Sequence, residues 1–290
     1  MRVLARIFLA SMSVCVCASQ ALAVEYKVVL MGGQSNMDGR ASASSLPPSL
    51  QAPQSDVKLF YSSITNNNIS SYSLPSSWTA LSPQAQGGSS FGPEITFGRA
   101  MADASPAANY ALIKYARGGT SLAADWKPGT GADYTNFRNT VAAGLQAITN
   151  GGDTYSIVGM CWLQGESDTG AAATAYQSNL STFISDVRGR YGANLPFIIG
   201  GIGYSGSNYD TILGAGSALA ASTPNVRFFD NSDLNNRSSL HFNAAGQQAI
   251  GQRYATALQS VPEPTGLLSL ALAGGASLLV RRRRGGAVRA

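Results

Sequence analysis

The feature that most constrains the fold is an alternation of apolar, strand-like runs with helical stretches along the middle of the chain. Strand-like runs occupy 26–31, 110–115, 156–163, 196–201 and 226–230, and helical patterns occupy 93–103, 132–149, 171–191, 209–221 and 243–258. Parallel strands joined by crossover helices produce this alternation. The run 156–163 is apolar throughout, as expected when both faces of a strand are covered. We therefore predict one three-layer α/β/α domain with a five-stranded parallel sheet.

Residues 42–86 interrupt this alternation. The segment is rich in Ser, Pro and Asn and has weak hydrophobic periodicity. It predicts a long surface excursion that contains at most a short hairpin around 57–61. Long loops in compact domains often bind ligands, so this segment is a candidate binding loop.

The first 23 residues have the pattern of a secretory signal peptide. Arg2 and Arg6 form a basic start, an apolar stretch follows, and Ala21-Leu22-Ala23 resembles a cleavage site. We predict that the mature protein begins near Val24 and is exported. A buried first helix is the alternative.

The other end, 261–290, has the pattern of a sorting signal. A Val-Pro-Glu-Pro motif at 261–264 precedes the uncharged stretch 266–280 and then a run of four arginines at 281–284. The uncharged stretch is shorter than the about 20 residues that span a bilayer. The tail resembles the PEP-CTERM signal, which implies transient membrane anchoring and removal by an exosortase-type enzyme. A permanent membrane anchor is the alternative.

These two ends distort the overall charge. The chain has 20 basic and 15 acidic residues and a pI of about 9.2, but seven of the arginines and Glu263 lie in the end segments. The domain 24–260 keeps 13 basic and 14 acidic residues and is therefore close to neutral. The basic pI is no argument for nucleic-acid binding.

Metal, cofactor and thiol chemistry have little support in this sequence. Within 24–260 the chain has one histidine, His241, and one cysteine, Cys161, which lies in an apolar run. Cys161 therefore has the pattern of a buried hydrophobic residue. No glycine-rich turn has the spacing of a phosphate or dinucleotide loop. We predict no metal and no cofactor.

The single histidine identifies a candidate general base, because imidazole is the side chain that titrates near neutral pH. The candidate nucleophile is Ser35, which follows the first strand in the glycine-rich run 32–39. Such a turn can expose the hydroxyl group and free its own N–H. A serine that caps a helix is the alternative.

Candidate oxyanion donors follow the next two strands. Gly118 and Gly119 come after the second strand, and Gln164 comes after the third. Backbone N–H groups and a side-chain amide are suitable donors to a developing oxyanion. A simple turn and a polar strand cap are the alternatives. Because the carboxyl ends of parallel strands share one edge, these motifs should meet there.

Together these motifs resemble the SGNH hydrolases, and more narrowly the sialate O-acetylesterase domain and the acetylxylan esterases of the sixth carbohydrate-esterase family. The matching segments are 33–37, 114–126, 162–168 and 240–246. The resemblance implies a flavodoxin-like fold and metal-free ester hydrolysis. It also implies Ser35 as nucleophile, with an oxyanion hole built from the Ser35 N–H, Gly118 or Gly119, and Gln164.

One position departs from the family pattern. The family carries an aspartate three residues before the histidine, and Ser238 stands there instead. Loss of the orienting carboxylate costs about 10⁴ in rate in a serine-protease triad. Asp233, on the same loop, is our preferred replacement, and Glu166 is the alternative carboxylate. A backbone carbonyl or Ser238 could also hold the ring, or the enzyme has lost activity.

The sequence thus predicts an exported esterase that removes O-acetyl groups from a polysaccharide such as xylan, or from a sialylated glycan. Its partners would be the acetylated carbohydrate, the export machinery and the tail-processing enzyme, and its location the cell surface or the medium. Trp126, Trp78 and Tyr204 could stack on sugar rings. A glycan-binding protein without catalysis, and a lipase or thioesterase, are the alternatives.

Overall fold

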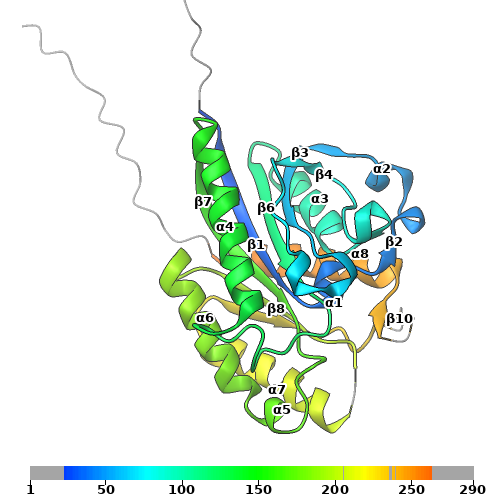
Figure 1. The fold of residues 1–290 in the computed structure, drawn as a ribbon, viewed down its shortest axis with the longest axis vertical. Helices are drawn as coiled ribbons and strands as arrows, with labels where there is room; N and C mark the ends of the chain where they lie inside the picture. The colour runs from blue at the N-terminus through cyan, green and yellow to red at the C-terminus, as the bar shows by residue number, and fades with distance from the viewer. Residues whose placement is uncertain (1–22, 205, 235–236, 239, 263–290) are drawn as a thin grey trace, which may run out of the picture.

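A computed structural model describes residues 23–262, apart from 205, 235–236 and 239 (Figure 1). The predicted signal peptide and the anchor and arginine run of the tail lie outside the described residues. Both therefore stay predictions. Within the described part of the chain, no helix is long and apolar enough to cross a membrane.

The core is a seven-stranded sheet in the order β4-β3-β6-β1-β7-β8-β9. All neighbours are parallel except β4, which is antiparallel to β3 at one edge. The strands are β1 (Glu25–Gly33), β3 (Gln54–Ser62), β4 (Thr79–Leu81), β6 (Asn109–Ala116), β7 (Thr154–Leu163), β8 (Phe197–Gly200) and β9 (Val226–Phe229). The five predicted strands are all present, and their mutual order is the flavodoxin-like 2-1-3-4-5.

The predicted strand number of five was wrong. β3 lies inside the segment 42–86, which we expected to be a surface excursion, and it pairs in parallel with β6. Val57, Leu59 and Phe60 of β3 are buried in the core. The strand is hard to recognise because its apolar run is short and stands among Ser and Asn residues. Pairing with β6 supplies the stability that the local sequence lacks.

Helices cover both faces of the sheet, which confirms the three-layer architecture (Figure 1). One face carries α4 (Ala132–Asn150), α6 (Tyr176–Tyr191) and α7 (Ser207–Ser222), and the other carries α3 (Glu94–Ala104) and α8 (Ala244–Gln259). Side chains of a strand alternate between the two faces. On β1, Val28 and Leu30 join the first core and Val29 and Met31 join the second.

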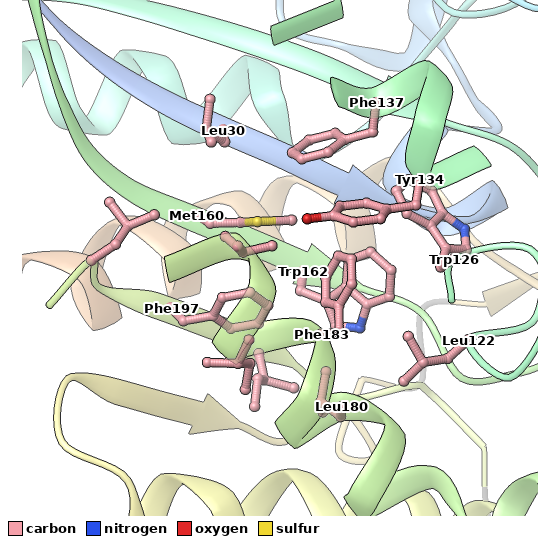
Figure 2. Close-up of a cluster of buried hydrophobic side chains, with 14 of the residues drawn as sticks. Leu30, Leu122, Trp126, Tyr134, Phe137, Met160, Trp162, Leu180, Phe183 and Phe197 are labelled. Carbon is pink, nitrogen blue, oxygen red and sulfur yellow. The ribbon is translucent and has the colours of Figure 1, made fainter. Parts of the chain in front are cut away.

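An aromatic cluster fills the core under α4 and α6 (Figure 2). Trp126 packs edge-on against Trp162 at a centroid distance of 4.9 Å, and Phe183 lies 4.6 Å from Trp162. Trp126 is fully buried, and Trp78 packs against Phe60 and donates to the Gly144 carbonyl. Trp126 is therefore unavailable to a sugar ring, and the partly buried Trp78 lines a different hollow from the one that holds Ser35.

On the other face, α3 and α8 pack at unusually close range. A Cβ atom at Gly251 of α8 would lie 2.0 Å from Oγ1 of Thr96 on α3, so only glycine fits. The Thr96 hydroxyl donates to the Gln248 carbonyl at 2.9 Å. This contact fixes the position of α8, and the segment that carries His241 leads directly into that helix.

Short elements complete the fold around the carboxyl edge of the sheet. They are α1 (Ser35–Asp38), β2 (Ala41–Ser42), α2 (Pro48–Gln51), β5 (Ser90–Phe91), α5 (Ala171–Thr174), β10 (Arg237–Ser238) and β11 (His241–Phe242), together with short 3-10 turns. β2 pairs with β5, and β10 pairs with β11. The candidate active site is built from these pieces and from the ends of the long strands.

Candidate active site

Ser35 occupies the first turn after β1, at the start of the four-residue helix α1. Gly33 has a φ of +152°, and a Cβ atom there would lie 2.1 Å from the Leu163 carbonyl oxygen. The same carbonyl accepts a hydrogen bond of 3.0 Å from the Gln34 N–H. This hydrogen bond holds the ends of β1 and β7 together. Only glycine at position 33 allows the two backbones to come so close.

Ser35 opens into a pocket of about 350 Å³ at the carboxyl edge of the sheet. The pocket is lined by Gln34, Ser35, Arg40, Asn67, Gly118, Gly119, Glu166, Ser167, Tyr204, Leu240 and His241. These residues follow β1, β3, β6, β7 and β8 or precede α8. The structure therefore brings together Ser35, His241, both predicted glycines and one of the two candidate carboxylates.

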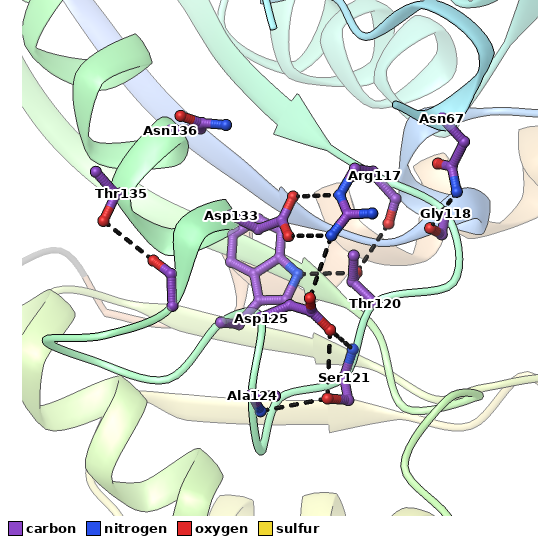
Figure 3. Close-up of polar contacts among 12 residues, drawn as sticks. Asn67, Arg117, Gly118, Thr120, Ser121, Ala124, Asp125, Asp133, Thr135 and Asn136 are labelled. Carbon is purple, nitrogen blue, oxygen red and sulfur yellow. Dashed lines mark hydrogen bonds and ion pairs between the residues drawn. The ribbon is translucent and has the colours of Figure 1, made fainter. Parts of the chain in front are cut away.

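Gly118 lies directly against the nucleophile candidate. A Cβ atom on Gly118 would lie 3.2 Å from the Ser35 Cβ and 3.3 Å from a guanidinium nitrogen of Arg40. The Asn67 amide donates to the Gly118 carbonyl at 2.7 Å, as Figure 3 shows. Within the described residues, the N–H groups of Ser35, Gly118 and Gly119 have no hydrogen-bond acceptor. They are available to a bound substrate.

Arg117 holds this glycine loop in place (Figure 3). Its guanidinium donates to both oxygens of the buried Asp133 at 2.8 and 2.6 Å, and to Asp125 at 3.2 Å. Asp133 belongs to the first turn of α4. The hydrogen bonds to Asp133 raise the pKa of Arg117, so the guanidinium stays charged. The loop is thus tied to a helix of the core before any substrate binds.

Gln164 does not supply the predicted third oxyanion donor. Its Nε2 donates to the Thr120 carbonyl at 2.9 Å and to Asp168 at 2.6 Å, while its Oε1 accepts from the Tyr176 hydroxyl. These two acceptors use both hydrogens of the amide nitrogen. If the amide were rotated by 180°, its oxygen would face the Thr120 carbonyl and the Asp168 carboxylate, which are both acceptors, so this orientation is the correct one. Gln164 is buried and is not among the pocket-lining residues. It links the loop after β7 to the glycine loop.

Asp168 completes that link. Its carboxylate is fully buried and accepts from the backbone N–H groups of Leu122 and Ala123 at 2.9 and 3.2 Å. Burial raises the pKa of Asp168 above its ordinary range. The side chain therefore stabilises the turn after Gly119 and does not contribute to the pocket.

Glu166 is the carboxylate that faces the pocket. Its Oε1 accepts from the Asn36 amide at 2.7 Å. Its Oε2 is shielded from solvent and has no hydrogen-bond partner within the described residues. Burial raises the pKa of Glu166. A buried acceptor without a partner is costly, so this oxygen is poised for a proton or a cation in the pocket.

Asp233, the preferred carboxylate from the sequence, lies elsewhere. It forms a two-pronged ion pair with Arg253 of α8 at 2.8 and 2.6 Å, and its side chain is 64% exposed. The hydrogen bonds to Arg253 lower the pKa of Asp233. Asp233 does not line the pocket. We preferred Asp233 because it is close to His241 along the chain. In the structure, the ion pair with Arg253 holds the Asp233 side chain on the outer surface.

His241 lies in the two-residue strand β11, where it pairs with Ser238 of β10. The Ser238 side chain lies outside the described residues, so its predicted role in holding the ring stays a prediction. His241 is partly buried, and none of the described residues hydrogen-bonds its ring. Two causes lower the pKa of His241: burial is the larger one, and the positive charge of Arg40 is the smaller one. The imidazole is therefore a neutral base at physiological pH.

Asn36 connects the three reactive candidates, and the sequence analysis missed its role. Its amide donates to Glu166 at 2.7 Å and to the Leu240 carbonyl at 3.4 Å, and its oxygen accepts from the Phe242 N–H at 3.1 Å. Leu240 and Phe242 flank His241. The available signal was the position of Asn36 directly after Ser35 in the motif that carries the resemblance.

A buried network of charged side chains connects α1 to β6 and α3. Lys114 of β6 pairs with Glu94 at 2.6 Å, and both side chains are 1% exposed. The Lys114 ammonium also donates to the Asp38 carbonyl at 2.8 Å. The Asp38 carboxylate accepts from the Tyr61 hydroxyl and pairs with Arg40. Burial raises the pKa of Tyr61, so this hydroxyl remains a donor.

Other pocket residues also escaped the sequence analysis. Asn67 stands in the segment 42–86 with a left-handed φ of 56°, and Gln34 and Arg40 flank α1. Tyr204 is the one aromatic residue of the three predicted for stacking that lines the pocket. Among the described residues, no group of three or more histidine, cysteine or carboxylate side chains could hold a metal ion.

The fold and the pocket together define a class of protein. A serine after the first strand, a histidine before the last helix and free N–H groups at the edge of a parallel sheet are the parts of a serine hydrolase. The family profile described as "Carbohydrate esterase, sialic acid-specific acetylesterase" matches residues 25–260. The chain belongs to this carbohydrate O-acetylesterase family.

Solved structures agree on the fold. A protein from Arabidopsis thaliana has a TM-score of 0.64 and 22% identity, over 81% of this chain and 98% of its own. A carbohydrate acetylesterase from Xanthomonas citri has a TM-score of 0.60 and 23% identity, over 81% of this chain and 56% of its own. NanS has a TM-score of 0.61 and 16% identity, over 82% and 98% respectively. A comparison with curated protein sequences found no match.

Proposed function

We propose that the protein is an exported serine esterase that removes O-acetyl groups from carbohydrates through an acetyl-Ser35 intermediate. One observation carries this proposal. Ser35 and His241 come from opposite ends of the domain and line the same pocket, beside the free N–H groups of Gly118 and Gly119. Membership of the carbohydrate O-acetylesterase family supports the acetylated carbohydrate as substrate.

In the first half of the reaction, the Ser35 Oγ attacks the acetyl carbonyl carbon while His241 takes the hydroxyl proton. The carbonyl oxygen becomes an oxyanion and accepts hydrogen bonds from the N–H groups of Ser35 and of the glycine loop. The tetrahedral intermediate then collapses. The C–O bond to the sugar breaks, His241 returns its proton to the departing sugar oxygen, and an acetyl group remains on Ser35.

Water completes the cycle. His241 removes a proton from a water molecule, and the resulting hydroxide attacks the acetyl carbon. The same N–H groups donate hydrogen bonds to the oxyanion of the second intermediate. Its collapse breaks the bond to Ser35, His241 returns the proton to the serine oxygen, and acetic acid leaves and ionises to acetate in water.

We assign the orienting carboxylate to Glu166. Burial lowers the pKa of His241 and raises that of Glu166, so it disfavours the charged form of each group in the free enzyme. When His241 takes a proton, the free Oε2 of Glu166 is the carboxylate oxygen at the pocket that can stabilise the imidazolium. Asn36 holds the other oxygen.

Export is a separate part of the proposal. It is supported by the signal-peptide pattern of 1–23 and by the sorting-signal pattern of 261–290. We propose that the stretch 266–280 anchors the protein transiently before an exosortase-type enzyme removes it. The esterase domain would then act at the cell surface or in the medium.

The experiment that tests the esterase activity is acetate release by residues 24–260 from p-nitrophenyl acetate and from acetylated xylan. Ser35→Ala and His241→Ala should each lower kcat by about 10³-fold or more. Ser232→Ala, which removes an exposed hydroxyl outside the pocket, should retain full activity. Equal turnover by the Ser35→Ala variant and the unaltered protein would refute the proposal.

A further inference from the structure

A second and larger hollow lies beside the catalytic pocket. Its volume is about 750 Å³, and it is formed by three stretches of the segment that follows β3. The stretches are 63–66, 73–75 and, apart from the buried Ala85, 83–88, and Tyr61 also lines the hollow. The mechanism proposed above uses none of these stretches.

Two consecutive residues connect this hollow to the catalytic pocket. Asn66 lines the hollow, and its neighbour Asn67 lines the pocket and donates to the Gly118 carbonyl. A third hollow of about 500 Å³, formed by 42–44, Gln51, 82–83 and 88–89, shares Pro83 and Gly88 with the second. The second and third hollows therefore adjoin each other, and Asn66 and Asn67 connect the second hollow to the pocket that holds Ser35.

The lining of the second and third hollows carries no charged residue. The sequence shows the same property, because no charged residue occurs between Lys58 and Glu94. An anionic ligand would lose water of hydration in such a site without gaining a counter-ion. A neutral ligand with many hydroxyl groups would not have that cost.

The walls combine hydrogen-bonding groups with small apolar surfaces. Asn66 and Gln86 are exposed, and neither side chain has a hydrogen-bond partner within the described residues. Both have left-handed backbones, with φ values of 49° and 51°, which are uncommon for residues other than glycine. Leu74, Pro75 and Pro83 add apolar contacts. Free amides beside apolar patches suit the hydroxyl groups and C–H faces of sugars.

We propose that these two hollows are subsites for the chain of an uncharged, acetylated polysaccharide whose acetyl group enters the catalytic pocket. The inference rests on the proposed function and goes further, because it places a neutral polymer along residues 63–66 and 83–88. An acidic monosaccharide such as a sialic acid would leave both hollows empty.

The test compares three proteins on small and large substrates. Asn66→Gly with Gln86→Gly removes both amides, and glycine retains the left-handed backbone without strain. The matched control is Gln177→Ala, which removes an exposed amide from α6. The substrates are p-nitrophenyl acetate, acetylated xylo-oligosaccharides of increasing length and an O-acetylated sialic acid.

For the unaltered protein, kcat/KM should rise with oligosaccharide length and exceed that for the sialic acid. The double variant should raise KM for the long oligosaccharides by about 5- to 20-fold through two lost hydrogen bonds. Its kcat/KM for p-nitrophenyl acetate should be unchanged, and the control should resemble the unaltered protein. No length dependence, an unchanged KM in the double variant, or a preference for the sialic acid would overturn the inference.

Binding provides a readout that does not depend on catalysis. Calorimetry on Ser35→Ala with an unacetylated xylo-oligosaccharide should show binding that Asn66→Gly with Gln86→Gly weakens by a similar factor. If no acetyl ester is hydrolysed but this binding is observed, the proposed esterase fails and the subsites remain. If esters are hydrolysed but the oligosaccharide does not bind, the subsites fail and the esterase remains.

Discussion

The two walls of the catalytic pocket are built in different ways. The wall that carries Ser35 rests on a buried charge network, in which Lys114, Glu94 and Asp38 connect β6, α3 and α1. The wall that carries His241 consists of a two-residue strand pair, and Asn36 provides its described hydrogen bonds to α1. Both walls contact the core, the first through buried charges and the second through the buried Phe242 side chain, but the described hydrogen bonds between the second wall and α1 come from Asn36 alone.

Because of this difference, substitutions in one wall should mainly change the stability of the fold, and substitutions in the other should mainly change catalysis. Buried charges are costly to leave unpaired, so changes to the Ser35 wall should act mainly on stability. The hydrogen bonds of the His241 wall position the histidine rather than pair a buried charge, so changes to them should act mainly on turnover. The predictions below test this separation, from the largest expected effect to the smallest.

The largest effect should come from Lys114→Met. Methionine has a similar volume but leaves the Glu94 carboxylate buried with only the Gly92 N–H as partner. We expect the free energy of unfolding to fall by about 3–5 kcal/mol. Urea denaturation followed by circular dichroism measures it. The control is Arg190→Met, which breaks the surface pair with Asp186 and should cost no more than about 1 kcal/mol. Equal losses in both variants would contradict the account.

Asn36→Ala should lower kcat by about 100-fold, because His241 loses its attachment to α1 and a shift of about 1 Å has that cost. KM for p-nitrophenyl acetate should change little. The control is Asn243→Ala, which removes the helix cap of α8 and should cost about 1 kcal/mol of stability without loss of kcat. Steady-state kinetics and unfolding of the same preparations measure both. Full turnover by Asn36→Ala would show that His241 is held in another way.

Glu166→Gln distinguishes the two candidate carboxylates. The amide keeps the shape but cannot stabilise an imidazolium, so kcat should fall at least about tenfold. Asp233→Asn should leave kcat within about twofold, since that side chain is exposed and pairs with Arg253. Kinetics with acetylated xylan measure both. The reverse order would restore the carboxylate preferred from the sequence.

The pH dependence should show the smallest effect. A general base acts in its neutral form, and burial lowers the pKa of His241. The acid limb of kcat/KM should therefore have a midpoint below 6.5, the pKa of an ordinary imidazole. Arg40→Gln removes a nearby positive charge and should move this midpoint upward, whereas Arg99→Gln on α3 should not move it. A pH–rate profile with p-nitrophenyl acetate tests this. A midpoint above 6.5 in the unaltered protein would contradict it.

Much of the fold could be predicted because apolar runs and helical periodicity are local properties. The helix predicted at 132–149 is α4, at Ala132–Asn150, and the one predicted at 243–258 is α8, at Ala244–Gln259. β3 was missed because its identity as a core strand depends on pairing with β6, which lies far along the chain.

The site was predictable where a short motif implies a local geometry. Ser35 and Gly118 lie in glycine-rich turns at strand ends, and the common edge of parallel strands brings them together. Which carboxylate lines the pocket was not predictable, since Arg253 holds Asp233 outside it and Asn36 holds Glu166 in it. Gln164 failed as a donor because Thr120 and Asp168 already use its amide hydrogens.

The most direct test of the central claim is to trap the acetyl group on the enzyme. Glu166→Gln would be mixed with p-nitrophenyl acetate, quenched in acid within milliseconds to seconds, digested and examined by mass spectrometry. The account predicts one added acetyl group on the peptide that contains Ser35, and none in His241→Ala, in which Ser35 is not activated. Acetate release without any acetyl-Ser35, or with the acetyl group on another side chain, would contradict it.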